Sequence, residues 1–373
     1  MFRADRVSEL PAIERVTVEL GARRYDVEIG RDLLASAGDR IEAALGHRRA
    51  VVVADAALDA TPHLAALMSG LDAPILTVAP GEASKSLSTY AALVEDVLAL
   101  RPDRATAIVA VGGGVVGDLA GFAAATVLRG VPYVQVPTTL LAQVDSAVGG
   151  KTGINSRHGK NLVGAFHQPA LVLADLATLD TLPPRELRAG YAEIVKYGLL
   201  GDAAFFAWLE QHGPGALAGD AGALAHAVAT SVKAKAAIVA ADEEERSGTR
   251  ALLNLGHTFA HALEALGGMG GELRHGEAVA IGLVDAVRLS ARLGFASDAD
   301  AARVEAHLAA VGLPTRRAQA GAPAPDAVVQ AMRGDKKASA GRLAFVLVRG
   351  IGRAFLHRDV GEAELLAHLH ANA

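Results

Sequence analysis

The sequence predicts an α/β N-terminal domain with a Rossmann-like parallel sheet, followed by a mainly α-helical C-terminal domain. Three observations support this fold class. Apolar runs of strand length alternate with helix-length stretches in the first half, a glycine-rich turn occupies 111–118, and Ala- and Leu-rich helical segments dominate after residue 181. Strands that alternate with helices form βαβ units and parallel sheets. The expected domains are therefore 1–175 and 176–373.

The predicted elements follow this order along the chain. Strands 15–20 and 24–29 flank a short turn and form a hairpin. The alternating elements that follow are helix 31–45, strand 50–55, helix 57–69, strand 74–79, helix 86–100, strand 106–111, helix 115–128 and strand 132–137. A second extended pair, 343–348 and 352–357, lies close to the C-terminus.

Composition excludes several classes of protein. A chain of 373 residues with 51% hydrophobic residues can form two domains with full cores. The net charge of -5 argues against nucleic acid as a partner, and the absence of Cys excludes disulfides and thiolate metal ligands. The first 16 residues are charged throughout, and the longest apolar stretch, 105–128, is broken by three consecutive Gly and by Asp118. We therefore expect a cytoplasmic protein without a signal peptide or a membrane span.

The stretch VDSAVGGKTGIN, residues 144–155, contains the GKT tripeptide that ends a phosphate-binding P-loop. In a P-loop, four residues separate this GK pair from an earlier glycine, whose bare backbone lets N–H groups surround a phosphate. Asp145 stands at that position, and its carboxylate would repel a phosphate. The NTPase interpretation is therefore disfavoured, and Lys151 needs another explanation.

Lysine is scarce in this chain. The sequence has eight Lys against 28 Arg. An ammonium group is a compact point charge whose pKa responds to burial, so several of these lysines could converge on an anionic ligand. The alternative is chance placement, and the positions of the lysines on the motifs decide between the two. The eight are Lys85, Lys151, Lys160, Lys196, Lys233, Lys235, Lys336 and Lys337.

The turn VGGGVVGD, residues 111–118, has the G-x-G-x-x-G pattern at Gly112, Gly114 and Gly117. It follows a predicted strand and precedes a predicted helix, which is the context of a dinucleotide-binding turn. Close packing of helix on strand is the alternative explanation for these glycines. No acidic residue ends the next strand, so Asp55 or Glu82 would have to meet the ribose. The turn predicts a nicotinamide cofactor in a variant geometry.

The segment TRALLNLGHTFAHALE, residues 249–264, is predicted to form one helix with a narrow polar stripe. A solvated face is the alternative, but the rest of the helix is apolar, and Asn and His are unusual choices for solubility. Two of its histidines are four residues apart and could share a metal, although no Glu follows the first, so the HExxH template fails. The stripe consists of Arg250, Asn254, His257, His261 and Glu264.

Two further segments offer metal ligands. His275 begins a predicted helix in RHGEAVAIG, while Glu193 and Lys196 are three residues apart on one helical face in RAGYAEIVKYG. Two His and one carboxylate with an open fourth position form a catalytic zinc set. The residues alone leave open which two of the three His bind, and an ordinary polar role for each is the alternative.

Together these motifs resemble those of the 3-dehydroquinate synthase family of sugar-phosphate cyclases. The resemblance runs from about residue 80 to 337, in the family's order and approximate spacing. Ala147 and Ala260 depart from the family's usual Ser and Gly, but neither change removes a functional group. The matching stretches are GGGVVGDLAGFAAAT, VPTTLLAQVDSAVGGKTGIN, GKNLVGAFHQP, TLPPRE, AEIVKYG, LLNLGHTFAHALE, HGEAVAIG and DKK.

The resemblance implies a phosphate-eliminating lyase of the shikimate pathway, which makes aromatic amino acids. Its reaction converts 3-deoxy-D-arabino-heptulosonate 7-phosphate to 3-dehydroquinate and phosphate, with NAD and a divalent metal, zinc or cobalt. The metal ligands it implies are Glu193, His257 and His275, which leaves His261 to handle protons or support the ligands. It further implies a homodimer with a small-molecule substrate in the cleft between the domains, and no nucleic acid or membrane partner.

The same resemblance assigns substrate and cofactor residues. The substrate residues are Asp145, Lys151, Asn161, Lys196, Lys235, Arg250, Asn254, His261, one of Lys336 and Lys337, and Arg129, which in the family enters the active site of the other subunit. The cofactor residues are Asp55, Glu82, Lys85, Gly114, Val115, Asp118, Thr138, Thr139, Lys151, Lys160, Thr178 and Thr181. The resemblance then explains the scarce lysines as binding residues for anionic groups, because the substrate carries a carboxylate and a phosphate. Lys233 has no assigned role.

Three rival functions stay open at this point. A metal-dependent polyol dehydrogenase of the glycerol dehydrogenase type would share the architecture but would release NADH and would not need so many lysines. Another sugar-phosphate cyclase is closer, although Asn161 and the pair Asn254 and His261 favour the dehydroquinate branch. A non-catalytic nucleotide-binding regulator would not require a metal site together with a hydride cofactor.

Overall fold

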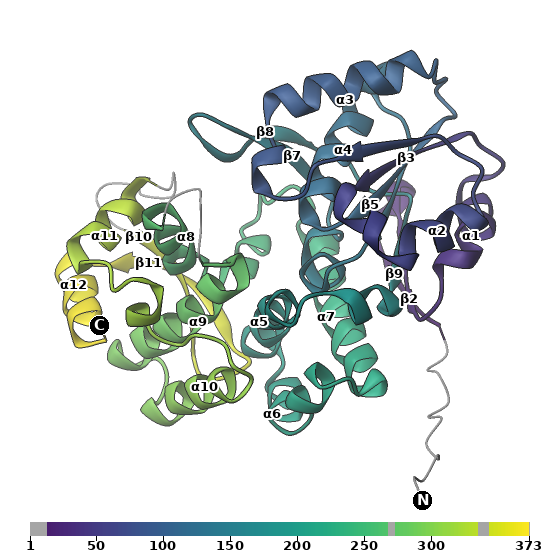
Figure 1. The fold of residues 1–373 in the computed structure, drawn as a ribbon. Coiled ribbons are helices and arrows are strands. Elements are labelled where there is room, and N and C mark those ends of the chain that lie inside the picture. Colours follow the sequence, from purple (N-terminus) through teal and green to yellow (C-terminus); the bar gives the residue numbers. More distant parts are fainter. Residues whose placement is uncertain (1–12, 268–272, 335–342, 373) are drawn as a thin grey trace, which may run out of the picture. The chain divides into compact units, whose positions relative to one another are not determined.

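The computed structural model describes residues 13–267, 273–334 and 343–372, which form two compact units (Figure 1). The first unit runs to Pro183 and also takes in Leu224–Glu244; the second holds Pro184–Ala223 and the chain from Glu245 onward. This partition differs from the expected single division near residue 175, because most of helix α7 (Ala221–Ala241) groups with the sheet. The Nζ atom of Lys235 in α7 donates a hydrogen bond of 2.6 Å to the backbone carbonyl of Asp145.

A seven-stranded sheet forms the centre of the first unit, in the order β1-β2-β9-β6-β5-β3-β4. Strands β1 and β2 pair antiparallel, and all other neighbours in this sheet are parallel. The predicted hairpin and the predicted parallel sheet are therefore confirmed. The strands are β1 (Glu14–Val18), β2 (Tyr25–Gly30), β3 (Ala50–Asp55), β4 (Ile75–Val78), β5 (Ala107–Gly112), β6 (Tyr133–Pro137) and β9 (Leu171–Asp175).

Helices cover both faces of this sheet. The apolar side chains of α1 and α2 pack into the core on one face, and those of α3 and α4 pack into the core on the other. Neighbouring strands β3 and β5 are thus followed by helices on opposite faces, and such a switch in direction opens a ligand crevice at the carboxyl ends of the strands. The helices are α1 (Ala37–Leu45), α2 (Pro62–Ser69), α3 (Leu87–Ala99) and α4 (Gly114–Thr126).

A separate two-stranded hairpin, β7 (Lys151–Ser156) with β8 (Gly159–Phe166), projects from the first unit (Figure 1). The sequence motifs 144–155 and 159–169 were not predicted as strands, because β8, GKNLVGAF, does not alternate apolar with polar residues and is exposed along nearly its whole length. The GKT tripeptide leads into strand β7, whereas a P-loop leads into a helix. The rejection of the P-loop interpretation is therefore confirmed.

The second unit is mainly helical, with one antiparallel hairpin near the C-terminus that confirms the predicted extended pair. Helix α9 is its central element and is buried along most of its length. The elements are α5 (Pro184–Gly201), α6 (Ala203–Leu217), α8 (His257–Leu266), α9 (His275–Arg292), α10 (Asp298–Ala310), α11 (Pro325–Gly334), β10 (Leu343–Val348), β11 (Ala354–Val360) and α12 (Glu362–Ala371). Short 3-10 turns lie at Gly21–Arg23, Leu34–Ser36, Ala56–Ala60, Glu82–Ser84, Val127–Arg129, Leu176–Thr181, Arg250–Asn254 and Arg317–Ala320, and a π-helical turn lies at Ala142–Ser146.

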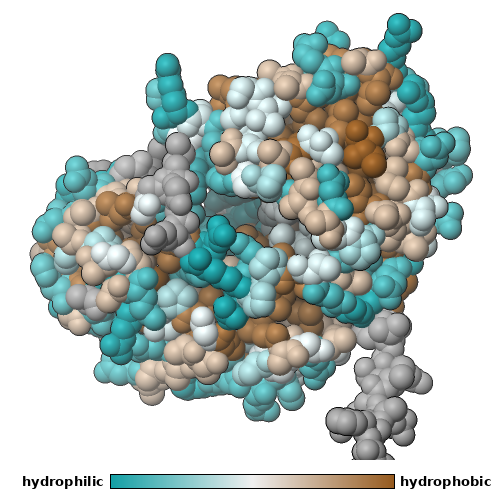
Figure 2. All heavy atoms as spheres, in the orientation of Figure 1, coloured by the Kyte–Doolittle hydropathy of each residue, from teal (hydrophilic) through white to brown (hydrophobic). Residues whose placement is uncertain are grey.

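One helix within the described residues, α7, is long and apolar enough to cross a membrane by length and composition. Its apolar window is 56% buried inside the protein, as in the core helices of soluble proteins that pass the same test. Figure 2 shows hydrophobic and hydrophilic residues side by side on one face of the molecule. Apolar residues such as Leu87 and Leu98 of α3 are exposed, which is common on the surface of folded domains.

Candidate active site

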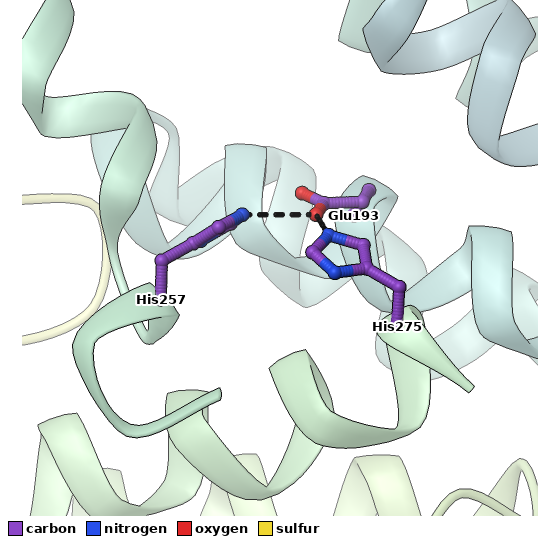
Figure 3. Close-up of side chains that lie close together, drawn as sticks. All are labelled: Glu193, His257 and His275. Carbon is purple, nitrogen blue, oxygen red and sulfur yellow. Dashed lines mark ion pairs between the residues drawn. The ribbon is translucent and has the colours of Figure 1, made fainter. Parts of the chain in front are cut away.

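Three side chains from three helices of the second unit form a compact cluster with the composition of a metal site. Glu193 comes from α5, His257 from the start of α8 and His275 from the start of α9 (Figure 3). Their ligand atoms all lie within 4.8 Å of one another, with Nε2 of His257 at 3.4 Å and Nε2 of His275 at 3.5 Å from Oε1 of Glu193. Tetrahedral zinc with bonds of about 2.0–2.1 Å holds its ligand atoms about 3.3 Å apart. The cluster therefore fits one such ion.

Close helix contacts at glycines bring these ligands together. A Cβ at Gly276 of α9 would lie 1.8 Å from the carbonyl oxygen of Ala189 in α5. A Cβ at Gly282 of α9 would lie 2.1 Å from the carbonyl oxygen of Gly256, directly before α8. Because neither position carries a side chain, α9 can approach both neighbours at backbone distance and align its first residue with the other two ligands.

The predicted single helix over 249–264 is wrong. Arg250–Asn254 forms a 3-10 turn. The helical conformation is interrupted at Gly256, whose φ is +80°, and α8 begins at His257. Glycine adopts this left-handed conformation at little cost, and here it also admits the backbone of α9. The polar stripe thus belongs to two elements, and the break places His257 at a helix start.

The second ring nitrogen of each histidine has an acceptor. Nδ1 of His257 lies 3.1 Å from the carbonyl oxygen of Leu255, and Nδ1 of His275 lies 3.5 Å from Oε2 of Glu264. A carbonyl oxygen can only accept, so Nδ1 of His257 carries the proton and Nε2 presents a lone pair toward Glu193. Partners of this kind orient histidine ligands in metal proteins.

Glu193 is fully buried, and none of the described residues donates a hydrogen bond of good geometry to either of its oxygens. The ammonium of Lys196, itself 1% exposed, lies 2.6 Å from Oε2 as an ion pair. Burial raises the pKa of Glu193, but the neighbouring ammonium of Lys196, together with the imidazoles of His257 and His275, outweighs burial and holds that pKa well below its ordinary value. A buried carboxylate whose oxygens lack hydrogen bonds of good geometry fits the ligand of a metal ion, which would bind it directly.

The two histidines titrate differently in the metal-free protein. Burial lowers the pKa of His257. Burial also opposes the charged form of His275, but Glu193 and Glu264 outweigh it and raise the pKa of His275 to about 10. A metal ligand must be a neutral imidazole, so metal binding at this cluster displaces a proton from His275.

Other predicted substrate residues of the second unit lie on the segments around this cluster. Arg250 is buried, and His261 is exposed with its ring centroid 5.5 Å from that of His257. Asn254 lines a cavity of about 360 Å³ together with Arg246 and Arg358. Lys336 and Lys337 lie outside the described residues.

The first unit places predicted cofactor residues around the carboxyl ends of β3 and β5. A Cβ at Gly112, the last residue of β5, would lie 3.1 Å from Cβ of Asp55, the last residue of β3. The absence of a side chain therefore lets the glycine turn lie against the end of the neighbouring strand. Gly114 begins α4, and Val115 follows it.

Lys85 is the centre of a polar cluster in this unit. Its buried Nζ donates to Oδ2 of Asp118 at 2.7 Å and to Oδ1 of Asn161 at 2.5 Å. Burial raises the pKa of Asp118, and Lys85 offsets only part of that rise. Glu82 lies one turn before Lys85 and accepts a hydrogen bond of 2.7 Å from Nδ2 of Asn155. Predicted cofactor residues and the predicted substrate residue Asn161 thus share one network.

A second ion pair joins Asp145 in the π-helical turn to the buried Lys235 of α7. Lys151 and Lys160 are exposed on the β7–β8 hairpin. Arg129 is exposed at the end of the 3-10 turn after α4 and has φ of +67°.

The four predicted threonines occupy turns after parallel strands. The backbone N–H of Thr138 donates to the carbonyl of Gly112 at 2.9 Å, and Oγ1 of Thr139 accepts from a backbone N–H at 3.2 Å. The hydroxyl of Thr178 donates to a backbone carbonyl at 2.7 Å, and that of Thr181 lies 2.8 Å from Nε2 of His63.

Sequence reasoning gave no role to three residues that hold predicted site residues in place: Asn155, His63 and Glu264. Glu264 was visible in the polar stripe, and Asn155 ends the quoted TGIN motif. No sequence signal marks His63, because its contact with Thr181 joins residues 118 apart in the chain.

Comparison with known proteins identifies the family of the chain. Residues 75–189 match the family model of the 3-dehydroquinate synthase N-terminal domain, and 190–338 match that of the C-terminal domain. The chain is 56% identical over 371 residues to the 3-dehydroquinate synthase of Rhodospirillum rubrum, covering 97% of this chain and 96% of that one.

Two solved structures of cyclases are also similar. One is 2-deoxy-scyllo-inosose synthase complexed with carbaglucose-6-phosphate, NAD+ and Co2+, with a TM-score of 0.85, 28% identity, and coverage of 96% of this chain and 100% of that one. The other is the 2-epi-5-epi-valiolone synthase of Streptomyces hygroscopicus with NAD+ and Zn2+ bound, with a TM-score of 0.83, 31% identity, and coverage of 99% of both chains. The two family models and the near-complete match at 56% identity show that this chain belongs to the 3-dehydroquinate synthase family.

Proposed function

We propose that this protein converts 3-deoxy-D-arabino-heptulosonate 7-phosphate to 3-dehydroquinate and phosphate, a step of the shikimate pathway. The observation that carries the proposal is the cluster of Glu193, His257 and His275, whose ligand atoms lie within 4.8 Å of one another in a chain of this family. The reaction needs a metal and a nicotinamide, and both groups are present in the similar cyclases with NAD+ and Co2+ or Zn2+.

The residues of both units fit these two groups. The two imidazoles and the carboxylate of the cluster suit zinc or cobalt, which both accept these ligands. The glycine turn after β5 and the cluster around Lys85 suit a dinucleotide at the switch point between β3 and β5. When bound, the metal polarises a substrate hydroxyl as a Lewis acid and the nicotinamide takes a hydride and later returns it.

The residues of the second unit have electrostatic roles. The ammonium of Lys196 balances part of the charge of Glu193 and keeps this carboxylate ionised in a fully buried position. Glu264 orients the ring of His275, and the carbonyl of Leu255 orients the ring of His257. His261 is exposed beside His257 and is placed to exchange protons with solvent during ring opening and closure.

The cationic residues bind the doubly anionic substrate. Lys151 and Arg250 supply positive charge, and Asn161 and Asn254 supply amide donors, for the carboxylate and the phosphate. These groups hold the phosphate where its charge develops on leaving, which lowers the barrier to elimination. The ion pair of Asp145 with Lys235 fixes the turn that precedes Lys151. One of Lys336 and Lys337 is the last of the proposed substrate-binding residues.

The cofactor set consists of Asp55, Glu82, Lys85, Gly114, Val115, Asp118, Thr138, Thr139, Lys151, Lys160, Thr178 and Thr181. We further propose a cytoplasmic homodimer in which Arg129 of each copy reaches the substrate bound to the other copy. Arg129 is exposed on the first unit, as this role requires.

The test is a turnover assay with the purified protein. Incubation with the heptulosonate phosphate, NAD and zinc should release phosphate and produce 3-dehydroquinate without net formation of NADH. Glu193→Ala and His275→Ala should lose both metal binding and turnover, and Lys151→Ala should weaken substrate binding and turnover together. Accumulation of NADH with a polyol would instead favour a dehydrogenase. A metal-replete, active His275→Ala variant would refute the ligand set.

A further inference from the structure

One side-chain amide joins two parts of the first unit that serve different ligands in the proposed function. Nδ2 of Asn155 donates to Oε1 of Glu82 at 2.7 Å, and Oδ1 of Asn155 accepts from the backbone N–H of Asn161 at 3.0 Å. Glu82 belongs to the proposed cofactor set and Asn161 to the substrate set. Asn155 belongs to neither set, yet it touches both.

Asn161 needs an outside hydrogen-bond partner because the β7–β8 ladder is interrupted beside it. Ile154 pairs with Val163, and Ser156 pairs with Gly159. These two pairs are two residues apart on β7 but four residues apart on β8, so β8 bulges between them. Asn161 lies in this bulge with φ of +54°, a conformation that Asn tolerates better than most residues. Bulges re-aim side chains next to functional sites, and here the side-chain oxygen Oδ1 of Asn155 accepts the hydrogen bond of the Asn161 backbone N–H.

An amide side chain suits both contacts of Asn155. The carboxylate of Glu82 is an acceptor, and the backbone N–H of Asn161 is a donor, so the side chain between them must offer a donor and an acceptor on separate atoms. Aspartate would place a second carboxylate against Glu82. The main chain of Asn155 is fixed as well, because its N–H donates to the carbonyl oxygen of Lys85 at 2.7 Å.

These contacts close a ring with the cluster around Lys85. The backbone of Asn161 is held by Asn155, and its side-chain carbonyl is held by the ammonium of Lys85 at 2.5 Å. Glu82 and Lys85 lie on one short 3-10 turn and its cap. Any ligand that fixes this turn therefore also fixes the position and direction of Asn161.

We propose that Asn155 is a positioning residue that couples dinucleotide binding to substrate binding, which rests on the proposed function. Bound dinucleotide immobilises Glu82 and Lys85. Through its hydrogen bonds to Glu82 and to Asn161, Asn155 then also restricts Asn161, so the substrate binds to a preformed site. By thermodynamic linkage, bound substrate raises the affinity for the dinucleotide by the same factor.

The experiment measures the KM for the heptulosonate phosphate, by phosphate release from the zinc-loaded protein, at NAD concentrations from limiting to saturating. For the unmodified protein, saturating NAD should lower this KM by about fivefold or more, the lower bound of common coupling factors. In Asn155→Ala the ratio of the two KM values should fall to about 1, with kcat at saturating ligands changed less than KM. A purely structural defect would instead lower kcat and Tm together.

Two further variants make the test specific. Asn155→Asp keeps the acceptor for the Asn161 N–H but repels Glu82, so it should lose the coupling and also weaken NAD binding in a direct titration. His158→Ala is the matched control, because His158 is exposed in the turn of the same hairpin and touches neither Glu82 nor Asn161 through any contact of the described residues.

The outcomes separate this inference from the proposed function. Turnover by the unmodified protein with a KM independent of NAD would overturn the coupling and leave the function standing. A normal coupling ratio in a folded Asn155→Ala, or an equal loss of coupling in His158→Ala, would also overturn it. Absence of turnover in the unmodified protein would overturn both.

Discussion

Replacing Gly276 with alanine should disrupt the metal cluster without touching a ligand. The new Cβ would lie 1.8 Å from the carbonyl oxygen, 2.4 Å from the carbonyl carbon and 2.7 Å from the Cα of Ala189. All three are backbone atoms, so rotation of a side chain cannot relieve the clash. Ordinary contact begins at 3.4 Å, so the start of α9 must move away from α5 by about 1.6 Å, the difference from the shortest of these distances.

This displacement is large compared with what a metal site tolerates. Ligand distances in metal sites hold to about 0.2 Å, and His275 directly precedes the altered residue. The movement would separate His275 from Glu193, and losses of about 10- to 100-fold in metal affinity accompany smaller disturbances of ligand orientation. Overpacking also costs about 1–3 kcal/mol of folding free energy, which corresponds to a Tm lower by roughly 2–4 °C for each kcal/mol in a domain of this size.

Zinc affinity measured by competition with a chromogenic chelator, and Tm by circular dichroism, test this expectation. The control is Gly201→Ala at the end of α5, where a Cβ would meet nothing within 4 Å. That variant should retain the affinity and stability of the unmodified protein. Equal zinc affinity in Gly276→Ala and Gly201→Ala would show that the backbone contact between α5 and α9 does not position His275.

Three other outcomes are expected. Removal of the metal with a strong chelator should abolish phosphate release and lower Tm, and added zinc or cobalt should restore both, whereas activity unaffected by chelation would exclude a metal role. Lys85→Met should weaken NAD binding and cost about 1–3 kcal/mol of unfolding free energy, because it leaves the partly buried carboxylate of Asp118 without its ammonium partner. Urea unfolding that matches the unmodified protein would contradict this. Burial lowers the pKa of His307 below 6.5 in the folded state, so His307 stabilises the protein fully above pH 6.5 and that contribution is lost as the pH falls toward the lowered value. His307→Gln should remove this part of the pH dependence of urea unfolding, and an unchanged slope below pH 6.5 would refute the assignment.

Much of the fold could be predicted because the relevant signals are local. Buried strands of the parallel sheet are continuous apolar runs, as in β5, and the glycine turn follows directly in sequence. Glu193 and Lys196 could be placed on one helical face from their spacing, and the structure brings their charged groups to 2.6 Å. Periodicity and spacing act over a few residues, which is the range that a single sequence reveals.

The remaining features depend on contacts between distant segments. The break at Gly256 was missed because the reason for it lies in α9, where Gly282 requires the close approach. Asn155 was missed because its partners, Glu82 and Asn161, are brought together by a hairpin with no apolar alternation. Residue spacing could not decide which histidines share a carboxylate, since His257 and His275 lie on separate helices whose packing sets the answer.

The path of α7 has a consequence for synthesis on the ribosome. The sheet unit recruits Leu224–Glu244 after the chain has already passed through α5 and α6, so translation of the first 183 residues does not complete it. Until α7 has emerged, the carboxylate of Asp145 lacks the ammonium of Lys235, and a nascent chain stalled before that point holds an unfinished sheet unit. Folding of this half is thereby tied to the elongation of the helical half that interrupts it.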